Sequence, residues 1–319
     1  MIYLFCFTSS FNLDWIKMKI KKRTIKIAFL LFIIILAAFL TYRFFTKNHY
    51  QFKVDTFHYS KYRKTPEYSM SLKESNSSFD VYTINYISKN FLSYETKIYG
   101  LLFMPKLQAK VPGIVLLPGG GVKKEDKSKL ASKLADWGYA VLTIDQRGIG
   151  ETGGYYLNFE QDYEIFSKGD EPIQHLSVYD ALAAFDVLRQ IKGVDNDNIA
   201  IAGESMGGRY ALITAALDKR LKGVIGISTS GFHYKKTNAQ YDNYMVSIDP
   251  DHYVSAISQN WLLMIHGTKD KTISLNDAKA TFDAANEPKK FFIVEGCGHG
   301  YCDKMDGSLK ESLGYLFNS

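Results

Sequence analysis

Cysteine and proline are both scarce in this 319-residue chain, which contains three cysteines and seven prolines. So few cysteines exclude a disulfide framework as the main source of stability. The low proline content, together with 46% hydrophobic and 14% aromatic residues, excludes a disordered or collagen-like chain. The composition therefore predicts a globular fold with a sizeable hydrophobic core.

Most of the chain also lacks an excess of positive charge. The formal net charge is +6 at pH 7, but residues 1–26 hold six Lys or Arg residues against Asp14 alone, a local charge of +5. The remaining residues carry only +1. Binding to a phosphate backbone needs a basic stripe, so nucleic acid is not an expected partner.

One run near the N-terminus has no charge, residues 27–42 between Lys26 and Arg43. Because flanking cations can snorkel, the apolar stretch 25–45 has the length at which a helix crosses about 30 Å of hydrocarbon. We expect an uncleaved signal anchor here. A cleaved signal peptide and a buried core helix are the alternatives, although the residues after Ala38 offer no small-x-small cleavage site.

The charges around this run predict its orientation. More Lys and Arg residues precede the run than follow it, so the positive-inside rule places the N-terminus in the cytoplasm. We expect a single-pass protein of the cell membrane, held in the lipid bilayer by its N-terminal helix, with an extracytoplasmic catalytic domain. The predicted segments are a basic cytoplasmic leader, a transmembrane signal anchor, a stalk and a folded domain, over residues 1–24, 25–45, 46–79 and 80–319.

From residue 80 onward, short apolar runs alternate with amphipathic stretches, starting with a hairpin. This order is typical of an α/β fold with a mostly parallel sheet and helices on both faces. Ligands of such sheets bind beyond the carboxyl ends of the strands. Eight strands are expected, over residues 81–87, 94–103, 113–117, 140–144, 199–202, 224–227, 262–265 and 291–294. Helices are expected over residues 127–137, 177–190, 207–217, 275–285 and 308–317.

A Gly-x-Ser-x-Gly pattern follows the strand expected at 199–202, in the sequence Gly203-Glu204-Ser205-Met206-Gly207. The pattern alone is weak, but helical sequence follows it at once. A turn this tight between a strand and a helix strains the serine backbone, and small residues two before and two after it avoid clashes. The context therefore predicts Ser205 as a nucleophile.

A serine hydroxyl is a poor nucleophile unless a base accepts its proton and a third group orients the base. Asp270 follows the strand expected at 262–265, and His299 follows the next strand. Parallel strands end at the same edge of a sheet, so we predict a catalytic triad of Ser205, Asp270 and His299. Considered one at a time, Asp270 could instead be a capping aspartate and His299 a structural histidine.

Attack on a carbonyl also needs N–H donors where negative charge develops. The strand expected at 113–117 ends in Pro118 and three glycines, whose backbone can approach a substrate closely. We assign the oxyanion hole to the N–H of Met206 with that of Gly119 or Gly120. A plain glycine turn is the alternative interpretation of this segment.

Cys297 and Cys302 lie on either side of His299. Three interpretations are open for them: a local disulfide, a metal site, and two unpaired small residues. One His and two Cys are one ligand short of a closed zinc site, which disfavours metal. No metal and no organic cofactor are expected.

Other side chains near the predicted site have mainly structural interpretations. Arg147 is expected to act as a structural clamp rather than as a substrate ligand. Glu204 is expected to be a bystander, and His266 to pack or bond locally. Three aromatic residues either line an acyl pocket or cover the core: Tyr155, Tyr156 and Phe159.

These motifs together resemble the α/β-hydrolase superfamily, in particular serine hydrolases similar to dienelactone hydrolases and to prolyl-oligopeptidase catalytic domains. The resemblance covers residues 80–319, and its pieces stand in family order: YGLLFMP, LLPGGG, ADWGYAVLTIDQRGIGETGG, VDNDNIAIAGESMGG, LLMIHGTKD and VEGCGHGY. One departure is Pro118, where many relatives have His. The resemblance implies an α/β-hydrolase fold that carries a Ser-Asp-His triad.

The expected function is that of a membrane-anchored serine hydrolase, which cleaves a carboxylic ester or related acyl bond through an acyl-enzyme on Ser205. The insert at about 229–260 is too short for the propeller that restricts oligopeptidases. A serine peptidase acting on short peptides is the first alternative. A non-catalytic, membrane-tethered scaffold on a hydrolase fold is the second.

Overall fold

The computed structural model describes residues 30–31, 33–37, 64–91, 94–237 and 240–318. The chain divides into two units, Met1–Gln51 and Phe52–Ser319. In the first unit the described residues are helical and exposed, but most of the predicted anchor 25–45 lies outside the described residues. Among the residues that are described, no helix is both long enough and apolar enough to cross a membrane.

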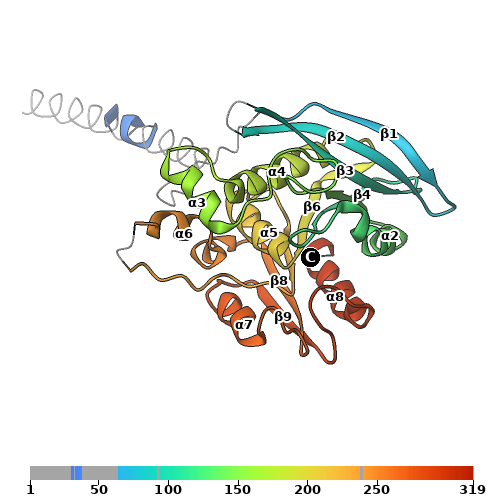
Figure 1. The fold of residues 1–319 in the computed structure, drawn as a ribbon. Coiled ribbons are helices and arrows are strands. Elements are labelled where there is room, and N and C mark those ends of the chain that lie inside the picture. The colour runs from blue at the N-terminus through green and yellow to red at the C-terminus, as the bar shows by residue number, and fades with distance from the viewer. Residues whose placement is uncertain (1–29, 32, 38–63, 92–93, 238–239, 319) are drawn as a thin grey trace, which may run out of the picture. The chain divides into compact units, whose positions relative to one another are not determined.

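The second unit contains a nine-stranded sheet, counted within the described residues, in the order β1-β2-β3-β5-β4-β6-β7-β8-β9 (Figure 1). The first three strands pair antiparallel, as does β3 with β5, and all later pairings are parallel. This confirms the predicted hairpin and the mostly parallel sheet. The strands are β1 (Tyr68–Ser75), β2 (Phe79–Phe91), β3 (Tyr94–Pro105), β4 (Val111–Leu117), β5 (Ala140–Ile144), β6 (Val194–Glu204), β7 (Gly223–Ile227), β8 (Trp261–Gly267) and β9 (Lys289–Val294).

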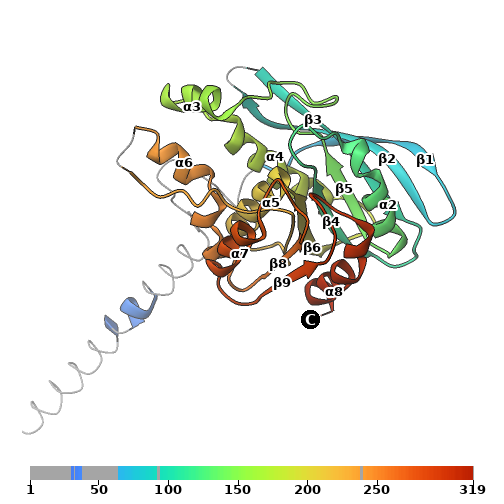
Figure 2. The same ribbon diagram turned by 60° about the horizontal axis from the view of Figure 1, so that its bottom comes forward.

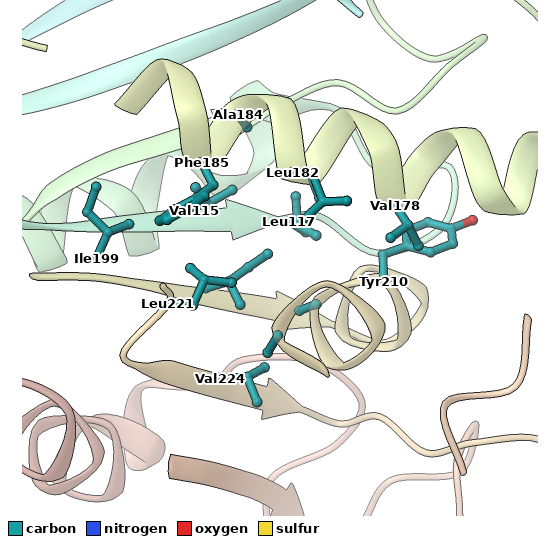
Figure 3. Close-up of a cluster of buried hydrophobic side chains, with 14 of the residues drawn as sticks. Val115, Leu117, Val178, Leu182, Ala184, Phe185, Ile199, Tyr210, Leu221 and Val224 are labelled. Atoms are coloured by element: carbon teal, nitrogen blue, oxygen red, sulfur yellow. The ribbon is translucent and has the colours of Figure 1, made fainter. Parts of the chain in front are cut away.

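Helices cover both faces of this sheet. Side chains of α4 and α5 pack on one face, where Phe185 lies beside Val115 and Leu182 beside Leu117 (Figure 3). Side chains of α2 and α8 pack on the other face, and α7 and α8 flank β8 and β9 on opposite sides (Figures 1 and 2). The helices are α2 (Ser128–Asp136), α3 (Phe159–Ser167), α4 (Ile173–Leu188), α5 (Met206–Leu217), α6 (Asp242–Ile248), α7 (Leu275–Asp283) and α8 (Asp306–Phe317).

Two features correct the predicted organisation. Strand β1 lies within the predicted stalk 46–79 and pairs with β2, so the sheet has nine strands rather than eight. It is an edge strand with mostly exposed side chains, and it therefore lacks the apolar run that identifies buried strands. The short helices α3 and α6 were also not predicted. Helix α3 begins at a capping box in which Asn158 and Gln161 bond each other's backbone.

A fully paired charge cluster ties the loop after β5 to the opening hairpin and to α4. The Arg147 side chain is fully buried and makes two 2.7 Å hydrogen bonds to Asp180, through Nε and Nη2. Its other contacts are Nη1 to Thr96 Oγ1 at 3.2 Å and Nη2 to the Lys89 carbonyl at 2.6 Å. These bonds confirm the predicted structural role of Arg147, and we call this group the clamp.

Candidate active site

Ser205 lies between the end of β6 and the start of α5. Its backbone angles are φ 52° and ψ −118°, in a region that non-glycine residues rarely occupy. Its N–H donates to the Ile227 carbonyl at 3.0 Å, and its carbonyl accepts from Thr229 Oγ1 at 2.7 Å. The next strand therefore holds the strained turn that presents the serine.

The glycines on either side of Ser205 are required by close backbone contacts. A Cβ on Gly203 would lie 2.3 Å from the Gly207 carbonyl oxygen, and a Cβ on Gly207 would lie 2.3 Å from the Pro118 carbonyl oxygen. Real Cβ atoms do not approach backbone this closely. The turn therefore has no room for a side chain at either position, as the sequence pattern predicted.

Asp270 and His299 meet at the ends of β8 and β9. His299 Nδ1 lies 2.9 Å from Asp270 Oδ2 and 3.0 Å from Oδ1, and the Asp270 side chain is fully buried. Burial alone would raise the pKa of Asp270. Hydrogen bonds from the Ile273 N–H, from His299 and from the Thr272 N–H outweigh this effect, so the pKa lies below its ordinary value.

An ionised Asp270 orients the imidazole. Because a carboxylate only accepts hydrogen bonds, His299 Nδ1 carries the proton, and Nε2 is the basic nitrogen of the neutral ring. The described part of the chain contains no hydrogen bond between Ser205 Oγ and His299. The structure thus brings the predicted acid and base into contact and leaves the serine unlinked to them.

The glycine loop after β4 lies against the serine turn. A Cβ on Gly119 would lie 3.6 Å from Ser205 Cβ, and one on Gly120 would lie 3.2 Å from Met206 Cε. Gln146 Nε2 donates to the Pro118 carbonyl at 2.7 Å and holds the loop from the side. The glycine loop and the start of α5, which carry the N–H groups predicted to form the oxyanion hole, therefore lie side by side.

Cys297 and Cys302 form a disulfide that encloses His299 in a short ring. The Cys297 carbonyl also accepts from the Lys269 N–H at 2.9 Å, next to Asp270. Within the described residues, no group of three His, Cys, Asp or Glu side chains is placed to hold a metal ion. The loop that carries His299 is thus fixed both to itself and to the loop that carries Asp270.

For three aromatic residues the sequence allowed two interpretations, and their side chains are exposed rather than part of the core. Tyr155, Tyr156 and Phe159 are 60%, 51% and 43% exposed. The hydroxyl of Tyr156 would lie 3.0 Å from a Cβ on Gly120, and Phe159 packs edge-on against Phe232 at 5.3 Å between ring centroids. We call these three exposed residues the aromatic rim, and Tyr156 is the member that contacts the glycine loop.

Two further side chains complete the site. His266 is buried and its Nε2 lies 3.0 Å from the Ile273 carbonyl, which confirms the predicted local bond. Glu204, which was predicted to be a bystander, is buried and paired. Its carboxylate lies 2.9 Å from Lys127 Nζ and accepts from the Tyr301 N–H at 3.4 Å.

The chain is similar to several known proteins. The model of the dienelactone hydrolase family matches residues 98–313, more than half of the chain. Protein YcjY of Escherichia coli is 30% identical over 139 residues, which cover 44% of this chain and 41% of that protein. Acetyl esterase Axe7A of Xylanibacter ruminicola is 28% identical over 177 residues, which cover 50% and 38%. The chain therefore spans about two fifths of the length of these relatives.

Among solved structures, acetyl xylan esterase 1 from Thermoanaerobacterium superposes with a TM-score of 0.66 at 17% identity. The match covers 83% of this chain and 91% of that one. At this identity the likeness shows a shared α/β-hydrolase fold.

Proposed function

The chain belongs to the dienelactone hydrolase family and is a hydrolase, and from this premise we propose that it cleaves carboxylic esters at Ser205. One observation carries the proposal: the buried Asp270 carboxylate holds His299 at 2.9 Å, at the same sheet edge as a serine with a positive φ. This is the arrangement that nucleophilic acyl transfer requires.

In the proposed reaction His299 Nε2 accepts the proton of Ser205 Oγ as the oxygen attacks the ester carbonyl. Asp270 stabilises the imidazolium that forms. The oxyanion accepts hydrogen bonds from the Met206 N–H and from the N–H of Gly119 or Gly120. Collapse of the intermediate transfers the proton from His299 to the leaving alkoxide and leaves an acyl-enzyme. Water then attacks this ester with the same base, which releases the acid and restores Ser205.

An O-acetylated carbohydrate is the substrate class that we propose first. The support is the named activity of two similar proteins, an acetyl esterase and an acetyl xylan esterase, together with an aromatic rim on which a sugar ring can stack. In the described residues, the segment from Thr229 to Asn260 forms α6 and two short 3-10 helices, and we propose a small substrate because so short an insert is not a large lid.

We further propose that the N-terminal segment anchors the enzyme in the cell membrane with the hydrolase domain outside the cytoplasm. The uncharged run 27–42 and the flanking Lys26 and Arg43 support an anchor. The disulfide beside His299 supports an oxidising compartment. Alkaline extraction of membranes tests the anchor, since an anchored protein stays in the pellet. Release of the full chain into the supernatant would overturn it.

The enzymatic test uses the full chain in detergent with p-nitrophenyl esters of increasing acyl length, acetylated xylo-oligosaccharides and aminoacyl p-nitroanilides. Hydrolysis of the acetyl esters is expected, and Ser205→Ala should lower kcat by about 10³-fold or more. Intact mass after treatment with a fluorophosphonate should show one adduct on the wild type and none on the variant. Hydrolysis of the anilides alone would show a peptidase. If no substrate is hydrolysed, the non-catalytic scaffold is favoured.

A further inference from the structure

A buried ion pair lies directly beside the candidate nucleophile. Glu204 precedes Ser205 in the chain, and only 7% of its side chain is exposed. Its partner Lys127, at the start of α2, is 13% exposed, and the two charged groups are 2.9 Å apart. The pair spans 77 positions of sequence, so it fixes α2 to the serine turn.

The same carboxylate contacts the loop that carries His299. Glu204 Oε2 accepts from the Tyr301 N–H at 3.4 Å, and a Cβ on Gly300 would lie 3.1 Å from that oxygen. Both contacts fall within two residues of His299. One carboxylate therefore touches α2 through Lys127, the turn of the nucleophile through the backbone, and the loop of the base.

The second oxygen of this carboxylate has no partner. Within the described residues Glu204 Oε1 is buried and makes no hydrogen bond. A buried ion pair is weak evidence for stability, because an apolar pair of similar size is often as stable or more so. An incompletely paired charge between the nucleophile's neighbour in sequence and the loop of His299 points instead to a positional role.

We propose that Glu204 is a positioning residue, which with Lys127 holds the loop 296–302 so that His299 Nε2 reaches Ser205 Oγ. The proposal rests on the proposed function, because it names the residue that joins the two halves of that catalytic site. The charge on Glu204 also favours the imidazolium that forms during the reaction, and Lys127 opposes this effect.

Other charged groups face the same loop and remain unchanged in the test. Asp270 contacts His299 from the end of β8. The Tyr301 hydroxyl bonds Lys133 of α2 at 2.7 Å and also contacts Asp306, at the start of α8. Asp303 pairs with Lys129 at 2.7 Å and with Lys133 at 3.0 Å. These groups set a common background for the variants below.

The test compares Glu204→Gln and Lys127→Met with the wild type on p-nitrophenyl acetate, using the full chain. Each variant should lower kcat by about 10- to 100-fold with KM changed less than about threefold. The midpoint of the acid limb of kcat/KM should fall by about half a unit in Glu204→Gln and rise by a similar amount in Lys127→Met. The double variant should return the midpoint to within about 0.2 units of the wild type.

Matched controls separate this role from a loss of folding. Lys279→Met removes an exposed cation of α7, and Glu295→Gln removes an exposed carboxylate in the loop before His299. Both controls should keep kcat within about twofold. A wild-type kcat in Glu204→Gln, or midpoints that move in the same direction in both single variants, would overturn the proposal.

Failure of the proposed function would be seen separately. If the wild-type chain hydrolyses no ester, NMR titration of the His299 ring, identified by its loss in His299→Asn, still reads the effect of the pair. The midpoint of the ring titration should again fall in Glu204→Gln and rise in Lys127→Met. Equal titration curves in the wild type and both single variants would overturn the positioning role whatever the substrate.

Discussion

The clamp around Arg147 and the candidate active site both bury charged side chains, but they differ in how completely these are paired. In the clamp, both oxygens of Asp180 bond Arg147, and Ser88 adds a further donor. In the active site, Glu204 Oε1 and His266 Nδ1 are buried without a partner among the described residues. The clamp is therefore a network whose buried charges are hydrogen-bonded, whereas the active site keeps buried polar atoms without a partner.

This difference separates two uses of buried charge. A fully satisfied network rigidifies the region where α4 meets the hairpin, and all of its bonding capacity goes into the fold. A site that must bind a substrate and move protons keeps unused hydrogen-bonding capacity and a strained residue such as Ser205. Substitutions in the clamp should therefore change stability, and substitutions in the site should change the reaction rate.

Asp270→Asn should have the largest effect on activity. The amide can still accept from the Thr272 and Ile273 N–H groups, so the loop stays folded. It favours the wrong tautomer of His299 and cannot stabilise an imidazolium, and kcat should fall by about 10⁴-fold with Tm changed by only a few degrees. Steady-state kinetics and calorimetry measure both. The exposed Asp283→Asn of α7 is the control, and a loss below tenfold would remove Asp270 from the triad.

Arg147→Met should have the largest effect on stability. It leaves Asp180 as an uncompensated buried charge, so the free energy of unfolding should fall by about 3–5 kcal/mol. Urea denaturation measures this loss, and kcat per folded molecule should stay within about twofold. Adding Asp180→Leu to this variant should recover part of the loss, because both charges are then gone. If Arg147→Met also lowered kcat per folded molecule well beyond twofold, the clamp would affect the reaction as well as the stability of the fold.

Loss of the Cys297–Cys302 disulfide should have an intermediate effect on kcat and on the free energy of unfolding. A bond that closes so short a ring stabilises the fold by about 2 kcal/mol in the chain-entropy model. Because the ring contains His299, reductant should also lower kcat, by about tenfold. The variant with both cysteines changed to Ser should show the same loss and no response to reductant. Full activity in the reduced wild type would show that the loop is held by its other contacts.

The strands and the contact between Asp270 and His299 were predictable because their signals are local. The strand Ala140–Ile144 has the predicted bounds, since five buried residues in a row form an unbroken apolar run. Asp270 and His299 each follow such a run, and the topology of a parallel sheet then brings them to one edge. These positions follow from sequence patterns of a few residues.

The remaining features depend on partners that are distant in sequence. Strand β1 is polar and exposed, and it is defined by its pairing with β2 rather than by an apolar face. Glu204 contacts Lys127 and also Tyr301, which is 97 positions away. The choice between a disulfide and free cysteines depends on a Cα separation of 6.1 Å. No local pattern encodes these contacts.

Tyr156→Ala should have the smallest effect and the most specific one. Its ring is half exposed and its hydroxyl approaches Gly120, so it belongs to the active-site region but bonds no catalytic group. Loss of one stacking surface should raise KM for an acetylated xylo-oligosaccharide about three- to tenfold and leave KM for p-nitrophenyl acetate within about twofold. Tyr156→Phe keeps the ring and should keep both values. An equal rise for both substrates would mean that Tyr156 shapes the glycine loop, and an unchanged KM for both would place the sugar elsewhere on the rim.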